Sequence, residues 1–347
     1  MTNQSRREFM ISMAIAGAAT SFSTFGHAAA TNAHDWDWLK GDWNVWHRRL
    51  KERLAGSNDW EEFAGKSSGW PLLDGLGNAD DNIVELPGGV YRGLTVRAFD
   101  PTTRQWAIWW IDGRNPTYIE PPVRGGFDGD SGTFVGRDVF KGRPITMRFR
   151  WLEVHGAKPH WEQAFSTDEG KTWEVNWVNF FTRTAPKATP LPTLAGAPRD
   201  WDFLVGSWQV RNRRLKQDGK QWEEFDSTLD NWRVLGGHGN VGDNLFKAAA
   251  GAYRGVSVRT FDAKTHEWLS WWLDGRSPTS FGTPSRGSFK DGVGTLIGDD
   301  TRDGKPIKVR SQWSRITPSS AHWEQAASED NGATWETNWS ADLARKS

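Results

Sequence analysis

Trp109-Trp110-Ile111-Asp112-Gly113-Arg114 is the stretch that decides the fold, because Trp271-Trp272-Leu273-Asp274-Gly275-Arg276 repeats it in the second half of the chain. Three more segments recur in the same order. They are residues 35–39, 60–63 and 160–163, with copies at 200–204, 222–225 and 322–325. A repeat of this length indicates two copies of one domain rather than a solenoid. The length of 347 residues agrees, since one domain typically takes about 150.

Each copy is predicted to consist of strands. Turn signals such as Asp100-Pro101-Thr102-Thr103 and Asp303-Gly304-Lys305 separate segments rich in Val, Ile, Thr and aromatic residues. One Ala-rich piece, residues 245–252, is the single candidate for a short helix. About ten antiparallel strands in one domain hide their edges by closing into a barrel. The sequence therefore predicts an all-β chain with two tandem antiparallel barrels.

The chain is predicted to begin with an export signal. Ser5-Arg6-Arg7-Glu8-Phe9-Met10 precedes a short, weakly apolar stretch, and Ala28-Ala29-Ala30 follows it. Paired arginines before Phe are typical of a twin-arginine signal, and an ordinary Sec signal is the alternative. The predicted divisions are a signal at 1–30, a first barrel at 31–184, a Pro- and Ala-rich linker at 185–199 and a second barrel at 200–347. The mature protein is expected in the periplasm or secreted, away from the membrane.

The first strand of each copy opens with a G-x-W motif. Gly41-Asp42-Trp43 and Gly206-Ser207-Trp208 resemble the opening of the calycin superfamily, which includes lipocalins and nitrobindins. Each repeat as a whole is similar to a bacterial family of Trp-rich, calycin-like secreted domains of unknown function. The resemblance implies calycin-like barrels with room for one small ligand. Nitrobindin's longer motif is absent, because Asn44-Val45-Trp46 follows Trp43. We expect no cofactor, with haem on a neutral histidine left open.

Composition excludes several function classes. Lys plus Arg and Asp plus Glu both number 43, so bulk charge gives no reason to expect nucleic-acid binding. Cysteine is absent, which excludes disulfides and thiolate nucleophiles. No metal site is expected, since only His160 and His322 recur and zinc needs three protein ligands. The 24 tryptophans stand out in a chain whose mean hydropathy is −0.68.

Polar and aromatic groups that recur in both copies are candidates for a ligand site. Side chains alternate across a strand, so Tyr91, Thr95 and Arg97 share one face. Arginine could bind an anionic ligand, or pair with acids such as Asp112 and Glu162 inside a polar barrel. The hypothesis is a protein that binds a small aromatic, sugar-like or anionic molecule. Its candidate residues are Arg49, Tyr91, Arg97, Trp109 and Arg148 in the first copy, and Arg214, Tyr253, Arg259, Trp271 and Arg310 in the second.

The alternative hypothesis is a cofactor-independent lyase, isomerase or hydrolase. His160 and Glu162 share a strand face and could act as an acid–base pair, as could His322 and Glu324. Arg97 or Arg148 would then hold an oxyanion. The same residues could instead form a salt-bridged pair at the rim. The sequence does not decide between these readings, and it does not indicate an oligomeric state.

Two local motifs are predicted to be structural. Ser166 to Trp173 and Ser328 to Trp335 fit S-x-D-x-G-x-x-W, which resembles the Asp-box hairpin of sialidases and other secreted β-proteins. In such a hairpin Asp caps the turn and Gly adopts a positive φ. Asp112 and Arg114 are expected to form a structural ion pair at a strand end.

Overall fold

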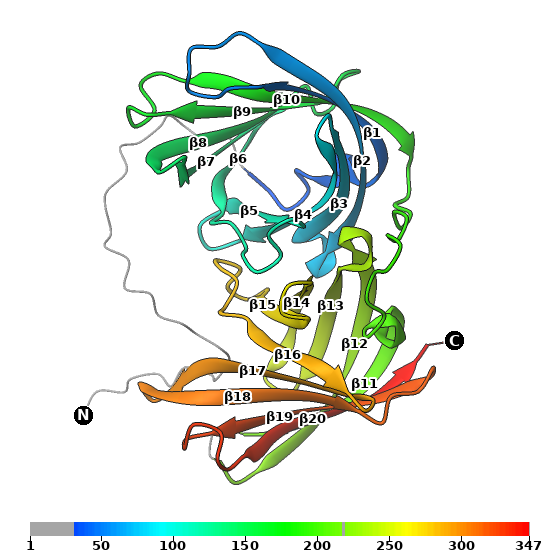
Figure 1. Cartoon of the computed structure of the whole chain (residues 1–347). Coiled ribbons are helices and arrows are strands. Elements are labelled where there is room, and N and C mark those ends of the chain that lie inside the picture. The colour runs from blue at the N-terminus through cyan, green and yellow to red at the C-terminus, as the bar shows by residue number, and fades with distance from the viewer. Residues whose placement is uncertain (1–30, 217–218, 347) are drawn as a thin grey trace, which may run out of the picture.

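The chain forms two closed antiparallel barrels, each of ten strands. The computed structural model describes residues 31–216 and 219–346, and the predicted signal at 1–30 lies outside them. Each strand pairs with the next, while the last strand of each barrel pairs with its first (Figure 1). The predicted all-β fold of two tandem barrels is confirmed. In the part of the chain that the structure describes, no helix is long and apolar enough to cross a bilayer.

The strands of the two barrels correspond one to one. The first barrel contains β1 (Gly41–Leu50), β2 (Trp60–Leu72), β3 (Gly77–Leu86), β4 (Gly89–Asp100), β5 (Gln105–Asp112), β6 (Val123–Asp128), β7 (Ser131–Phe140), β8 (Arg143–Leu152), β9 (His160–Ser166) and β10 (Glu174–Ala185). The second contains β11 (Gly206–Leu215), β12 (Trp222–Val234), β13 (Gly239–Ala248), β14 (Gly251–Asp262), β15 (Glu267–Asp274), β16 (Ser285–Lys290), β17 (Val293–Arg302), β18 (Lys305–Ser314), β19 (Ser320–Ser328) and β20 (Glu336–Arg345).

The short helix expected at residues 245–252 is wrong. These residues end β13 and begin β14, and Ala248 pairs directly with Gly251. Gly251 has a φ of 128°, which glycine adopts without strain. Phe246 stacks on Tyr253 with 4.8 Å between ring centroids, so packing across the hairpin outweighs the helix propensity of alanine.

One end of the first barrel is packed solid around Trp36. This residue precedes the short 3₁₀ helix η1 (Asp37–Leu39) and is only 2% exposed. Its ring lies 5.0–6.3 Å from the rings of Trp106, Phe127, Phe134 and Trp151. Trp201, before η3 (Asp202–Leu204), fills the second barrel in the same way. The repeated segments 35–39 and 200–204 therefore close corresponding ends of the two barrels.

The two barrels pack through a pseudo-two-fold interface. In Figure 1, β3–β5 of the first barrel face β13–β15 of the second, and one apolar cluster is shared between them. The Leu73 amide donates to Asp243 at 3.1 Å, while the Leu235 amide donates to Asp81 at 2.9 Å. These two contacts are copies of each other, since Leu235 and Asp243 are the repeats of Leu73 and Asp81. Reciprocity of this kind is the signature of an isologous interface.

Residues between the barrels bond to both of them. Thr189 contacts Asp42 of the first barrel through its amide, at 2.9 Å, and through its hydroxyl. The Leu194 amide donates to the carbonyl oxygen of Gly236 in the second barrel at 2.8 Å. The connecting segment is thus part of the packed structure.

The two interface carboxylates predict a pH-dependent stability. Burial raises the pKa of Asp81 to about 7 and that of Asp243 to about 6. Both values exceed the unfolded value of about 3.9, so the folded state holds these protons more tightly and stability falls as pH rises from about 4 to 7. In the Asp81→Asn/Asp243→Asn variant, each side chain keeps an acceptor oxygen. We expect its free energy of unfolding in urea to fall less over this window than that of the wild type. Parallel pH profiles for the two proteins would contradict this.

Candidate ligand-binding site

The barrel half opposite the tryptophan plug, called the mouth below, carries a guanidinium between aromatic rings. Strand register places Arg49 on the inner face with Phe63 and Trp177. The Arg49 guanidinium lies 5.7 Å from the Phe63 ring and 5.2 Å from the Trp177 ring. Its Nε donates to Glu61 Oε1 at 2.9 Å. The Arg49 and Glu61 side chains are 20% and 17% exposed, so water reaches this half of the lumen.

Tyr91 lies in the same mouth, under a second arginine. The Arg114 guanidinium is 3.8 Å from the Tyr91 ring centroid. Arg114 pairs with Asp112 at 2.5 Å, which confirms the predicted ion pair at this strand end. Trp110 packs flat on Gly93, where an added Cβ would lie 2.1 Å from the ring. The recurring Gly is therefore required for Trp110 to line the mouth.

The second barrel repeats this arrangement. Arg214 pairs with Glu223 at 2.6 Å and stacks 5.0 Å from the Trp339 ring. Its Nη1 donates to the Tyr253 hydroxyl at 3.2 Å. Trp272 lies over Gly255 as Trp110 lies over Gly93. The two mouths share Arg, Glu, Phe, Tyr and Trp at equivalent positions.

The mouth charges are largely compensated within the site. Arg49 and Arg214 each pair with a glutamate, and Arg114 and Arg276 each pair with an aspartate. Burial raises the pKa of Tyr91 to about 12, so its hydroxyl stays protonated at neutral pH. Burial, followed by the Asp138 charge, raises the pKa of Glu120 to about 7. Together these groups offer hydrogen bonds and ring faces rather than a free charge.

Three residues of the mouth were not among the predicted ligand residues, namely Glu61, Arg114 and His47. Glu61 lies in the repeated segment 60–63, and Arg114 ends the repeated segment 109–114, so recurrence could have flagged both. His47 was missed because its counterpart is Asn212. It is 5% exposed, stacks on Phe63 at 4.8 Å, and its Nδ1 lies 2.6 Å from Asn179 Oδ1. Burial lowers the pKa of His47 to about 4, which keeps the ring neutral.

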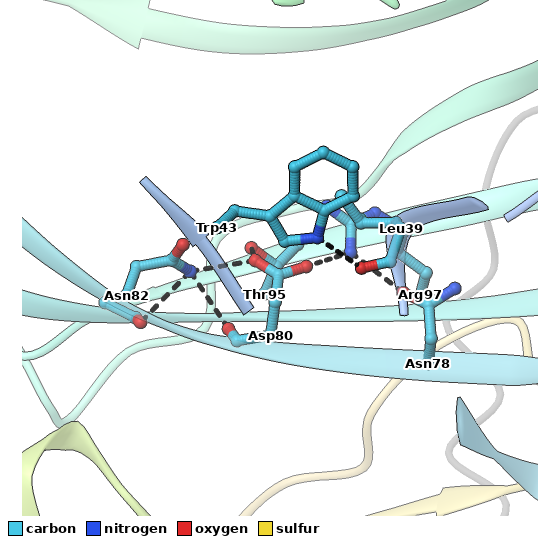
Figure 2. Close-up of polar contacts among 8 residues, drawn as sticks. Leu39, Trp43, Asn78, Asp80, Asn82, Thr95 and Arg97 are labelled. Carbon is cyan, nitrogen blue, oxygen red and sulfur yellow. Dashed lines mark hydrogen bonds and ion pairs between the residues drawn. The ribbon is translucent and has the colours of Figure 1, made fainter. Parts of the chain in front are cut away.

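Arg97 points into the first lumen, but deep under the plug. Figure 2 shows it on the same side of the sheet as Trp43, Asp80 and Thr95. Arg97 donates to Asn78 at 2.8 Å and pairs with Asp80, while Trp36 covers its guanidinium at 4.3 Å. It is 3% exposed. Of the two open alternatives for Arg97, the structure shows the internal pair, with Asp80 rather than Asp112 or Glu162.

Two other predicted ligand residues lie outside the first lumen. Trp109 is 2% exposed on the outer face of β5, within the apolar cluster between the barrels, and Trp271 holds the equivalent position on β15. Arg148 pairs across β7 and β8 with Val135, which is 41% exposed, so both face outward. Its guanidinium covers Trp173 at 4.3 Å, and Arg310 covers Trp335 at 4.9 Å.

The Asp-box hairpins join β9 to β10 and β19 to β20. The Thr172 amide donates to Asp168 at 2.9 Å, and Gly170 has a φ of 90°. Trp173 supports Arg148 from this turn. The predicted structural hairpins are confirmed, and their Trp side chains contact the outward arginines.

The histidine–glutamate pairs also lie on the outer face. His160 stacks on Phe180, which is 37% exposed, and its Nδ1 lies 3.2 Å from the Lys158 carbonyl oxygen. Glu162 is 3.6 Å from Arg150. In the second barrel His322 pairs with Asp342 at 2.7 Å and Glu324 with Arg310 at 3.4 Å. Neither histidine is joined to the glutamate two residues away, and neither pair meets the mouth residues.

Two cavities in the described chain lie away from the mouths. One, of about 390 Å³, is lined by Trp38, Trp43 and the β8–β9 loop at the plugged end of the first barrel. The other, of about 320 Å³, lies between residues 193–199 of the connecting segment and Asp202 and Arg233 of the second barrel. In residues 31–216 and 219–346, no group of three His, Asp or Glu side chains could hold a metal ion.

Comparison with known proteins gives no family for this chain. No family model matches it, and no curated protein matches it. Among solved structures it is similar to an S-type phycobiliprotein lyase from Guillardia theta, with 12% identity, 42% of this chain and 90% of that chain covered, and a TM-score of 0.31. It is also similar to a protein of unknown function from the DUF3598 family of Nostoc punctiforme, with 11% identity, 92% and 100% coverage, and a TM-score of 0.29.

Proposed function

We propose that the protein binds a small molecule with an aromatic or sugar-like ring in a barrel mouth. The observation that supports this most is the duplication of the mouth: Arg49, Glu61, Tyr91 and Trp177 have the counterparts Arg214, Glu223, Tyr253 and Trp339. These side chains face inward, and the Arg–Glu pairs among them are partly exposed, while the opposite half of each barrel is filled. Aromatic faces with a few converging hydrogen-bond groups are typical of small-molecule sites.

The internal ion pairs favour an uncharged ring in the mouth itself. An anion there would have to displace Glu61 from Arg49 or Glu223 from Arg214. Ring stacking needs no such exchange, and a well-packed aromatic pair contributes about 1 kcal/mol beyond its buried area. Export to the periplasm, predicted from residues 1–30, is a further part of this proposal.

The enzyme alternative finds no supporting geometry. A general acid–base pair must be within hydrogen-bond reach of its substrate. His160 and Glu162 lie on the outer surface of β9, on the opposite strand face from the mouth residues. We therefore favour binding over catalysis.

The test is a titration of the full chain with 1-aminoanthracene, a flat uncharged dye that fluoresces in apolar sites. We expect saturable enhancement in the wild type and a roughly tenfold weaker affinity in Trp339→Leu, because one ring face is lost. Trp46→Leu is the control, since Trp46 is 48% exposed on the outside of β1. Absence of binding, or equal weakening by both variants, would overturn the proposal.

A further inference from the structure

The second barrel buries an arginine without the carboxylate that its counterpart has. In the first barrel Arg97 pairs with Asp80, and the two side chains are 3% and 6% exposed. Gly242 replaces Asp80 in the second barrel. Arg259 is 7% exposed, and within the described chain no ion pair to a carboxylate is found for it. Its Nη1 donates to the amide oxygen of Asn240 at 2.9 Å.

This guanidinium keeps its charge in the folded protein. Burial lowers the pKa of Arg259 to about 9, which still leaves it protonated at neutral pH. The Trp201 and Trp313 rings lie 4.3 and 5.7 Å from it and compensate part of the charge. A buried cation without a counter-ion is unfavourable. An anionic group that enters the lumen could therefore pair with the Arg259 guanidinium.

Serine side chains border Arg259 on the inner face of the second barrel. Ser270 pairs with Arg259 across β14 and β15, and Ser285 pairs with Ser270 across β15 and β16. Both serines are partly exposed. The first barrel has Ile108 and Val123 at these positions, 4% and 1% exposed. At these two positions the wall of the first barrel is therefore apolar and buried, whereas the wall of the second barrel is polar and partly exposed to water.

The β18–β20 wall of the second lumen carries smaller side chains than its counterpart in the first barrel. The inward residues of β8–β10 in the first barrel are replaced by smaller ones in β18–β20: Met147, Phe149, Phe165 and Asn179 become Val309, Ser311, Ala327 and Ala341. Leu229 and Phe246 are larger than their counterparts Ser67 and Val84 on the β12–β13 wall. The second lumen therefore has smaller side chains on its β18–β20 wall and larger ones on its β12–β13 wall than the first lumen has.

The first mouth is covered by side chains that have no identical counterparts in the second barrel. Residues 51–59 join β1 to β2, and Leu54 packs against the core while its amide donates to the Glu174 carboxylate at 2.8 Å. Arg53 stacks on Phe140 and Phe165 at 4.7 and 5.6 Å. The corresponding connection, residues 216–221, is shorter. Arg302 and Ala327 replace the two phenylalanines, and Arg302 pairs with Glu329.

We propose that the second barrel binds the anionic group of a small ligand, with Arg259 as its counter-ion and Ser270 and Ser285 as hydrogen-bond donors. This rests on the proposed function and adds the location and the charge of the bound group. A guanidinium matches a carboxylate in shape and charge. Trp272 lies two residues along β15 from Ser270, so their Cα atoms are about 7 Å apart. This separation matches the length of a fused two-ring aromatic system. The ligand class is therefore an aromatic carboxylate.

The test compares 2-naphthoate with its uncharged isostere 2-naphthamide on the full chain, by isothermal titration calorimetry. We expect the carboxylate to bind at least about tenfold more tightly, since a charge-assisted hydrogen bond is about twice as strong as a neutral one. Arg259→Met should reduce this ratio to about one. The control Arg310→Met removes an outward guanidinium and should leave the ratio unchanged.

If Arg259→Met does not fold, a second variant still tests the proposed anion site. Ser270→Ile/Ser285→Val restores the first barrel's residues and should abolish 2-naphthoate binding, with an unchanged circular dichroism spectrum as the folding check. Equal affinities for both probes in the wild type would overturn the anion site while leaving the proposed function standing. Binding of neither probe, nor of 1-aminoanthracene, would overturn both.

Discussion

Trp36→Ala is expected to lower the free energy of unfolding by about 4 kcal/mol, the cost typical of truncating a large buried aromatic. Trp36 is 2% exposed and contacts aromatic rings on four sides. It also covers the Arg97 guanidinium at 4.3 Å. Removing the indole leaves a cavity at the plugged end that the closed sheet cannot collapse to fill. Urea unfolding followed by near-UV circular dichroism measures the loss.

A matched control separates the plug from tryptophan loss in general. Trp46 lies on the outer face of β1 and is 48% exposed. Trp46→Ala is expected to change the free energy of unfolding by no more than about 0.5 kcal/mol, as is usual for surface sites. Similar losses in the two variants would contradict the role given to Trp36.

Arg97→Met is expected to destabilise the protein by about 3–5 kcal/mol, because it strands the buried Asp80 carboxylate. Asp80 keeps hydrogen bonds from Thr95 and Asn82, both at 2.8 Å, but loses its only cation in the described part of the first lumen (Figure 2). The flexible thioether of Met fills the vacated space but cannot balance a charge. The change is again read from urea unfolding.

The same substitution in the second barrel is the internal control. Arg259→Met leaves no carboxylate behind, since Gly242 stands where Asp80 would be. It removes one hydrogen bond to Asn240 and one desolvated charge, so we expect a net change within about 1 kcal/mol. Equal destabilisation by the two variants would show that Asp80 is not what makes Arg97 necessary.

The sequence predicted the architecture because its signals are periodic and duplicated. Recurring segments indicated two domains, turn signals gave about ten strands in each, and strand alternation put Tyr91 and Arg97 on one face. The repeats, the turn signals and the strand alternation are all patterns that can be recognised in the amino-acid sequence itself. The Ala-rich segment at 245–252 failed because its backbone is held by cross-strand pairing that no local propensity reports.

The site was harder to predict because alternation does not say which strand face is inward. On β9 each face mixes polar and apolar residues, so Glu162 gave no sign of its direction, whereas on β8 the apolar Ile145, Met147, Phe149 and Trp151 alternate with Arg148 and Arg150, so the outward direction of Arg148 was readable from the sequence. Trp109 lies on a strand that is buried on both sides, and only the packing of one barrel on the other explains its burial. Differences between the repeats proved as informative as recurrence, since Gly242 and Ser270 mark the altered lumen.

The number of 2-naphthoate molecules bound per chain tests most directly the claim that the two barrels have diverged and that the second one binds the anionic ligand. Calorimetry of the full chain is expected to give one site, which persists when Leu54→Ala is introduced over the first mouth and disappears in Ser270→Ile/Ser285→Val. Two equivalent sites per chain, or a single site that survives the paired serine replacement, would contradict the account.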